Sequence, residues 1–262
     1  HILGLIIATE FSCQLTPCTG SVFHFSINMF CFLDFLLVFI LGENDRSVFF
    51  LCLLLANWVD FRERIRVNGE CISEQYIIDF VEKYTREFAS HVFLREKPAD
   101  QWTETTFEQT RLEAYRVAAG LMALGLNKGD KVSLLSEGRN MWVIGELGIL
   151  YAGAVNVPLS IKLEEGSDLV FRIKHSDSRF VMVSGTQLPK VRRIMAEIPA
   201  VEKVIVLDDL AEYKENEIPM SEVLKLGDKF MKENPGALEE RYKSIGPDDY
   251  ANISYTSGTT AD

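Results

Sequence analysis

The stretch that decides the fold is residues 131–158, which read KVSLLSEGRNMWVIGELGILYAGAVNVP. Lys131–Leu135 is a short apolar strand, and residues 139–151 form a helical segment after it. Residues 154–158 are predicted to form the next strand, and we expect Pro158 to end it because proline has no N–H to donate to a ladder. A strand followed by a helix and another strand is typical of a β-α-β unit.

The same alternation extends along the chain on both sides of this unit. Four apolar residues at helical spacing predict an earlier helix: Ile77, Val81, Tyr84 and Phe88. The later segments are predicted in the order helix 164–175, strand 180–183, helix 189–198, strand 203–207 and helix 220–232. Alternation of this kind indicates the α/β class, with a mainly parallel sheet that is covered by helices on both faces.

A capping box marks the start of the helix that precedes the first strand of the sheet. Thr106 and Gln109 have the spacing at which each side chain satisfies a free backbone N–H of the other, so the helix is predicted to begin at Phe107. Gly125 is the expected stop, because glycine adopts the left-handed conformation at little steric cost. Four residues are expected to line the buried face: Leu112, Tyr115, Ala119 and Met122.

A small hydroxyl-rich loop follows a strand-like run at residues 252–255. The loop consists of Thr256, Ser257, Gly258, Thr259 and Thr260. Glycine allows a tight turn that aims successive N–H groups into one concavity, and the hydroxyls add further donors, which is what a polyphosphate needs. Ligands of open parallel sheets bind beyond the carboxyl ends of strands, where this loop must lie. A polar turn without a ligand is the competing interpretation.

Other nucleotide and catalytic signatures do not fit the sequence. The loop lacks the Gly-Lys-Ser/Thr ending of a Walker A motif, and residues 134–139 carry no glycine fingerprint of an oxidoreductase or a kinase. The four histidines, His1, His24, His91 and His175, are scattered without an acid partner in register. Asp208-Asp209 and Asp248-Asp249 are interpreted as turn residues. We assign no catalytic residue and no metal ligand.

The run Tyr255 to Asp262, YTSGTTAD, resembles the opening of the phosphate-binding signature of AMP-forming adenylate synthetases, which continues in that family with Pro, Lys and Gly. Further patterns occur in the family's order: TFEQ at 106–109, GDKV at 129–132, GILYAGAVNVPL at 148–159 and HSDSRF at 175–180. Together they resemble the long-chain fatty acid CoA ligase branch. The resemblance covers about residues 72–262.

This resemblance implies a fold and a two-step ligation. Residues 72–262 would be the start of the large N-terminal domain of an adenylate-forming enzyme, ending inside the phosphate loop. The fatty acid would react with ATP, with Mg²⁺ assistance, to give an acyl-adenylate, and coenzyme A would then displace AMP. Thr256, Ser257, Gly258, Thr259 and Thr260 would hold the β- and γ-phosphates. The family's remaining site residues would follow Asp262, so we expect the 262-residue chain alone to lack ligase activity. A different carboxylic acid is the alternative substrate.

Composition separates residues 1–71 from the rest. All five cysteines occur by Cys71, and the first lysine is Lys83. The net charge of −11 argues against a nucleic-acid partner. The cysteines form no chelating pair, their odd number argues against a closed disulfide set, and their absence from the later part suits a reduced, cytoplasmic compartment.

Residues 1–71 have two interpretations. Their apolar stretches, residues 30–41 and 48–56, are each shorter than the roughly 20 residues that a spanning helix needs, and Asp34 interrupts the first. We favour upstream read-through sequence. The alternative is a peripheral membrane module, which would make this a membrane-associated protein without enzymatic activity. The sequence predicts no oligomeric state.

Overall fold

The computed structural model describes residues 77–97, 100–164, 166–246 and 248–255, and every statement below concerns this part of the chain. Two predictions lie outside it, namely the apolar segment 1–71 and the phosphate loop 256–260. Among the described residues, no helix has the length and apolarity that crossing a membrane requires.

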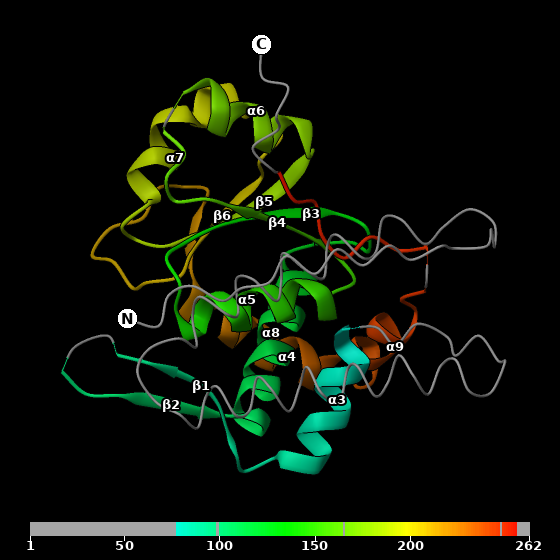
Figure 1. Ribbon diagram of the computed structural model, residues 1–262. Coiled ribbons are helices and arrows are strands. Elements are labelled where there is room, and N and C mark those ends of the chain that lie inside the picture. The colour runs from blue at the N-terminus through cyan, green and yellow to red at the C-terminus, as the bar shows by residue number, and fades with distance from the viewer. Residues whose placement is uncertain (1–76, 98–99, 165, 247, 256–262) are drawn as a thin grey trace, which may run out of the picture. The chain divides into compact units, whose positions relative to one another are not determined.

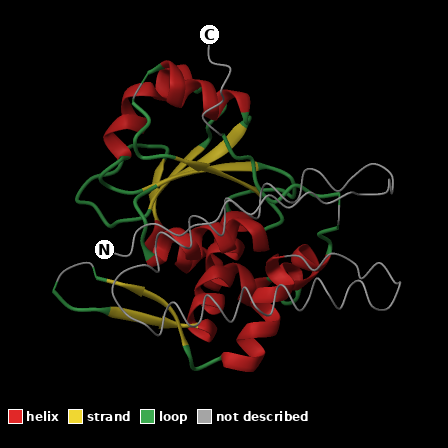
Figure 2. Ribbon diagram, in the orientation of Figure 1, coloured by secondary structure: helices red, strands yellow, loops and turns green. Residues whose placement is uncertain are grey.

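A parallel sheet lies at the centre of the described part (Figure 2). Its strands are β3 (Lys131–Leu135), β4 (Val155–Leu159), β5 (Ser178–Val183), β6 (Lys203–Val206) and β7 (Glu217–Pro219). They lie in the order β4-β3-β5-β6-β7, and each neighbouring pair is parallel. The predicted α/β class and parallel sheet are confirmed.

Helices cover both faces of this sheet (Figure 1). One layer contains α4 (Phe107–Ala123), α5 (Asn140–Tyr151) and α8 (Met220–Glu233), and the other contains α6 (Ser167–His175), α7 (Leu188–Ile194) and the 3-10 turn η1 (Met195–Glu197). The strands supply both cores, because Leu134 and Met182 belong to the first cluster of buried residues while Leu135 and Val183 belong to the second. Burial on both faces explains why the strands are apolar at most positions.

The β3–α5–β4 unit forms as its sequence predicts, with one correction. Pro158 does not end β4, because it pairs with Leu134 and the strand continues to Leu159. Asn156, two residues earlier, directs its N–H away from β3 and toward the carbonyl of Ala251, at 2.9 Å. The nitrogen of Pro158 therefore faces the same outer side, where β4 needs no N–H for its ladder with β3.

α4 begins and ends as predicted, and three of the four residues expected on its buried face are buried or pack against the core, namely Tyr115, Ala119 and Met122. Thr106 and Gln109 form the reciprocal capping box, and Gly125 has a φ of 90°. The N–H of Leu126 donates to the carbonyl of Leu121 at 3.0 Å, as in a Schellman motif. The predicted face was wrong at Leu112, whose side chain is 49% exposed. The buried residues are Phe107, Thr110, Ala114, Val117, Ala118, Ala119, Gly120 and Leu121.

Other helix boundaries and several small elements differ from the sequence prediction. α3 (Ile77–Phe88) forms as expected, whereas α6 begins at Ser167 rather than at residue 164. The sequence did not predict β7, α9 (Ala237–Lys243) or the antiparallel hairpin of β1 (Val92–Glu96) and β2 (Thr103–Thr106). The hairpin caps α5, because a carboxylate oxygen of Glu96 accepts from the N–H of Asn140 at 2.6 Å.

Candidate functional site

Residues 252–255 are the described segment that leads to the predicted phosphate loop. They do not form the predicted strand, because the only pairing assigned here is a parallel bridge between Asn252 and Asn156 of β4. The N–H of Ile253 donates to the carbonyl of Asn156 at 2.9 Å, and the N–H of Asn156 donates to Ala251. The segment therefore runs in the direction of β4, along the outer edge of the sheet (Figure 1).

Tyr255 fixes the carboxyl end of this segment against α6. Its hydroxyl donates to the carbonyl of Arg172 at 3.1 Å and lies 2.9 Å from Nδ1 of His175. Because the hydroxyl proton goes to the carbonyl, Nδ1 of His175 is the donor in the second bond. Burial raises the pKa of Tyr255, which keeps the hydroxyl protonated. The ring also packs edge-on against Phe171.

An ion pair fixes the chain just before the segment. Nζ of Lys128, in the turn before β3, lies 2.6 Å from Oδ2 of Asp249 and donates to the carbonyl of Ser244 at 2.6 Å. The N–H of Gly246 donates to the same Asp249 oxygen at 2.7 Å. The hydrogen bond from Lys128 holds the pKa of Asp249 below its usual value. Asp249 thus has the structural turn role that the sequence indicated.

A polar cluster lies at the carboxyl ends of the strands, at the point where the strand order reverses. β3 is followed by α5 on one face and β5 by α7 on the other, and this arrangement is the usual position of a ligand crevice. Arg139 donates to Asp208 at 2.7 Å, and Gln187 donates to Glu137. Burial opposes ionisation of Asp208, but the Gly185 N–H and Arg139 lower its pKa.

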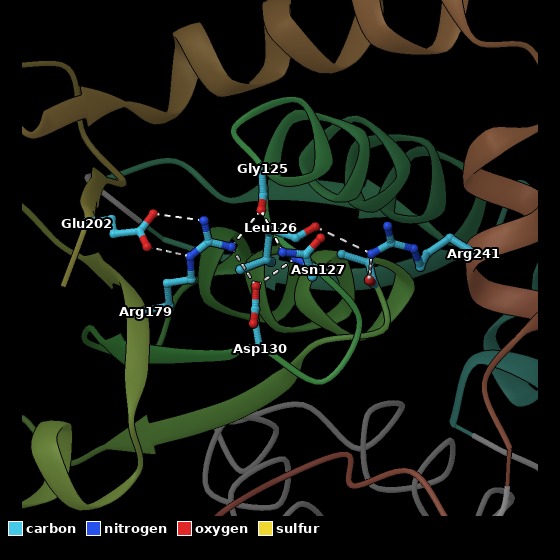
Figure 3. Close-up of polar contacts among 8 residues, drawn as sticks. Gly125, Leu126, Asn127, Asp130, Arg179, Glu202 and Arg241 are labelled. Atoms are coloured by element: carbon cyan, nitrogen blue, oxygen red, sulfur yellow. Dashed lines mark hydrogen bonds and ion pairs between the residues drawn. The ribbon is translucent and has the colours of Figure 1, made fainter. Parts of the chain in front are cut away.

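The amino ends of the strands carry a second polar network, which has a structural role (Figure 3). Arg179 of β5 donates to the carbonyl of Gly125 at 2.6 Å and to Asp130 at 2.8 Å, and it forms a bidentate pair with Glu202. Arg241 of α9 donates to the carbonyls of Leu126 and Ala152. The carbonyls of Gly125 and Leu126 lie just after the end of α4, where a positive charge is favourable for the helix dipole.

The remaining sequence candidates do not gather into a catalytic centre within the described residues. His91 is exposed before β1, and His175 is exposed at the end of α6. Asp209 accepts from the hydroxyl of Ser221 at 2.6 Å. No group of three or more His, Cys, Asp or Glu residues suited to a metal ion exists in the described part. Sequence reasoning missed the anchors Lys128 and Asn156, for which no local motif exists.

An open parallel α/β sheet with polar groups beyond the carboxyl ends of its strands is a common framework for ligand binding, nucleotides included. The comparison with known families is more specific. The family model described as AMP-binding enzyme matches residues 81–262, and the chain belongs to this family.

Curated relatives extend this result. The chain is 27% identical to the long-chain-fatty-acid–CoA ligase ACSBG1 of Mus musculus over 209 residues, which cover 77% of this chain and 28% of that protein. It is 30% identical to the 4-hydroxybutyrate–CoA ligase 2 of Metallosphaera sedula over 145 residues, covering 55% of this chain and 25% of the relative. The chain thus spans less than a third of the length of either relative.

Solved structures share the fold. The apo structure of MbtA from Mycobacterium smegmatis matches with a TM-score of 0.57 at 24% identity, covering 75% of this chain and 34% of that one. The N-terminal domain of FACL13 from Mycobacterium tuberculosis matches with a TM-score of 0.55 at 26% identity, covering 69% and 40%. The described part therefore shares its fold with a portion of each of these two proteins.

Proposed function

We propose that the protein to which this chain belongs is an acid–thiol ligase that converts a long-chain fatty acid to its acyl-CoA through an acyl-adenylate. The observation that carries the proposal is the family match across residues 81–262, a range that includes the hydroxyl-rich loop. The likeness to long-chain-fatty-acid–CoA ligases supports the acid. ATP and coenzyme A would be co-substrates. A cytoplasmic location, with peripheral membrane contact, belongs to the same proposal.

The chemistry explains why the loop residues matter. A carboxylate is a poor target for a thiol because its leaving group would be oxide, so the acid first attacks the α-phosphate of ATP and releases pyrophosphate. The N–H and O–H groups of Thr256, Ser257, Gly258, Thr259 and Thr260 would stabilise the charge that moves onto the pyrophosphate. Coenzyme A thiolate then displaces AMP. Mg²⁺ would enter with the ATP phosphates, and we assign it to no described residue.

A second acid is supported by a specific observation. The relative from Metallosphaera sedula is named as a 4-hydroxybutyrate–CoA ligase and has 30% identity over its matched region. A short or hydroxylated acid is therefore the alternative substrate on the same reaction course. A membrane module at residues 30–56 is the alternative from another class, and failure of that tagged segment to partition into liposomes would exclude it.

The test measures AMP and acyl-CoA formation by the longest protein that the reading frame of this chain encodes. The protein is mixed with ATP, Mg²⁺, coenzyme A and, in turn, a long-chain acid or 4-hydroxybutyrate. We expect thioester with the long-chain acid. Thioester with 4-hydroxybutyrate alone favours the second acid, and no AMP with any acid from a folded protein refutes the proposal.

Matched variants test the role of the loop. The double variant Ser257→Ala with Thr259→Val removes two proposed hydroxyl donors, and we expect kcat/KM for ATP to fall on the order of 100-fold. Ser221→Ala is the control, because this hydroxyl lies at the start of α8 and donates to Asp209. We expect the control to remain within about twofold of the wild type. Equal losses of kcat/KM in both variants would contradict the role of the loop in binding the phosphates.

A further inference from the structure

A carboxyl group and an amide meet in the interior beneath the outer edge of the sheet. Glu146 of α5 is 3% exposed and Asn156 of β4 is fully buried. Nδ2 of Asn156 donates to Oε1 of Glu146 at 2.7 Å. The second oxygen of each side chain, Oε2 of Glu146 and Oδ1 of Asn156, has no hydrogen-bond partner within the described part. Two unpartnered acceptors at one buried contact carry a free-energy cost that a single proton could remove.

We propose that Glu146 is protonated and pairs with the Asn156 amide through two hydrogen bonds, and that this pair positions residues 252–255. A carboxylic acid can donate its Oε2–H to Oδ1 while Oε1 accepts from Nδ2, so all four polar groups are used. When the acid loses its proton to water, Oε2 becomes a buried anion without a donor, and the second hydrogen bond is lost.

The surroundings of Glu146 favour the neutral form. Burial raises its pKa to about 7, and the hydrogen bond from Asn156 opposes part of that rise. Two acidic residues on neighbouring elements form hydrogen bonds near the two ends of α5, away from Glu146. Glu96 of β1 accepts from the first N–H of α5. At the other end, Glu82 of α3 accepts from Tyr115 at 2.6 Å and from Tyr151 at 2.8 Å.

The backbone of Asn156 connects this pair to the candidate site. Its carbonyl accepts from Ile253, and its N–H donates to Ala251, both at 2.9 Å. One residue therefore holds α5 with its side chain and the approach to the predicted loop with its backbone. Glu146 and Asn156 act as positioning residues in this arrangement. Their relevance to phosphate binding rests on the proposed function, whereas the pair itself does not.

The first test compares the pH dependence of unfolding for the full chain and for Glu146→Gln, whose amide can make the same two hydrogen bonds at every pH. Burial raises the pKa of the native acid to about 7, against its usual value of 4.5. Its stabilisation is therefore fully present below pH 4.5 and is lost as the pH rises through 7. Relative to the variant, the wild-type unfolding constant should rise about 40-fold between pH 5 and pH 7. Parallel pH profiles would overturn the proposal.

The second test measures amide hydrogen exchange, which does not depend on enzymatic activity. In Glu146→Ala, the N–H of Ile253 should exchange at least about tenfold faster than in the wild type, because Asn156 loses its side-chain partner. The N–H of Leu207, which donates to Val183 across the sheet, is the control amide. Glu146→Gln should restore the protection of Ile253. Should Glu146→Ala fail to fold, the pH comparison with Glu146→Gln decides alone. Unchanged exchange at Ile253 in folded Glu146→Ala would refute the positioning role, even if the protein proves to be a ligase.

Discussion

Gly227 of α8 lies where its helix crosses α4, and we expect Gly227→Ala to destabilise the protein. A Cβ at this position would lie 2.0 Å from the carbonyl oxygen of Arg116 and 2.8 Å from its carbonyl carbon. Both atoms belong to the backbone of α4, so no side chain can rotate away, and the helices must separate by about 1 Å. Overpacking of this kind costs about 1–3 kcal/mol, while alanine gains about 1 kcal/mol of helix propensity. Because the contact is with rigid backbone, we take about 3 kcal/mol for the overpacking, and subtracting about 1 kcal/mol of helix propensity leaves a net loss of about 2 kcal/mol.

The matched control is Gly145→Ala in α5. Its Cβ would meet only the sulfur of Met182, at 3.4 Å, which a flexible side chain can relieve. We expect this variant to be neutral or more stable by up to about 1 kcal/mol. Urea unfolding followed by circular dichroism measures both variants, and thermal unfolding should shift by about 2–4 °C per kcal/mol. If Gly227→Ala is as stable as Gly145→Ala, the close approach of α4 and α8 is not a determinant of stability.

Two further predictions concern the helix cap and the carboxyl edge of the sheet. Thr106→Ala removes the acceptor of the Gln109 N–H and should cost about 1 kcal/mol in thermal unfolding, whereas Thr103→Ala in the exposed strand β2 should cost less than half of this. Asp208→Asn weakens the contact with Arg139. Because the pKa of Asp208 is lowered in the native state, the wild type should exceed the variant in unfolding free energy by the full amount above the usual aspartate pKa of 3.8, and this difference should shrink as the pH falls below that value. An advantage that grows on acidification would contradict this assignment.

The elements that the sequence predicted are those with a local signature. β3, α5 and β6 alternate with turn residues, and their apolar runs are long enough to identify them. The capping box at Thr106 and the stop at Gly125 depend only on neighbouring residues, and both form. The burial of the strands on both faces follows from the absence of polar alternation.

The errors arose where distant parts of the chain decide the structure. The buried face of α4 includes Gly120, whose Cβ would lie 2.2 Å from the carbonyl oxygen of Val223, so close packing against α8 buries small residues that we had not assigned to the buried face. Leu112 was left outside as a result. The hairpin of β1 and β2 has a polar second strand, Thr103–Thr106, without strand periodicity.

The candidate site was predicted only in part for the same reason. Its loop has a motif, but the contacts that hold the preceding segment join residues far apart in sequence. Tyr255 and His175 are 80 positions apart, and Lys128 reaches Asp249 from the turn before β3. No pattern within a helix or strand relates such pairs, so only the folded chain reveals them.

These anchors have a common physical consequence for the proposed phosphate loop. Small hydroxyl residues and glycine offer little side chain for packing, and a segment that contains glycine loses much conformational entropy when it is ordered. Catalysis by hydrogen-bond donors requires that the donors be positioned before charge develops. The ion pair of Lys128 and Asp249, the backbone of Asn156 and the hydroxyl of Tyr255 fix the approach at three points. On the proposed function, they reduce the ordering that ATP binding must otherwise impose, so loss of any one should raise KM for ATP more than it lowers kcat.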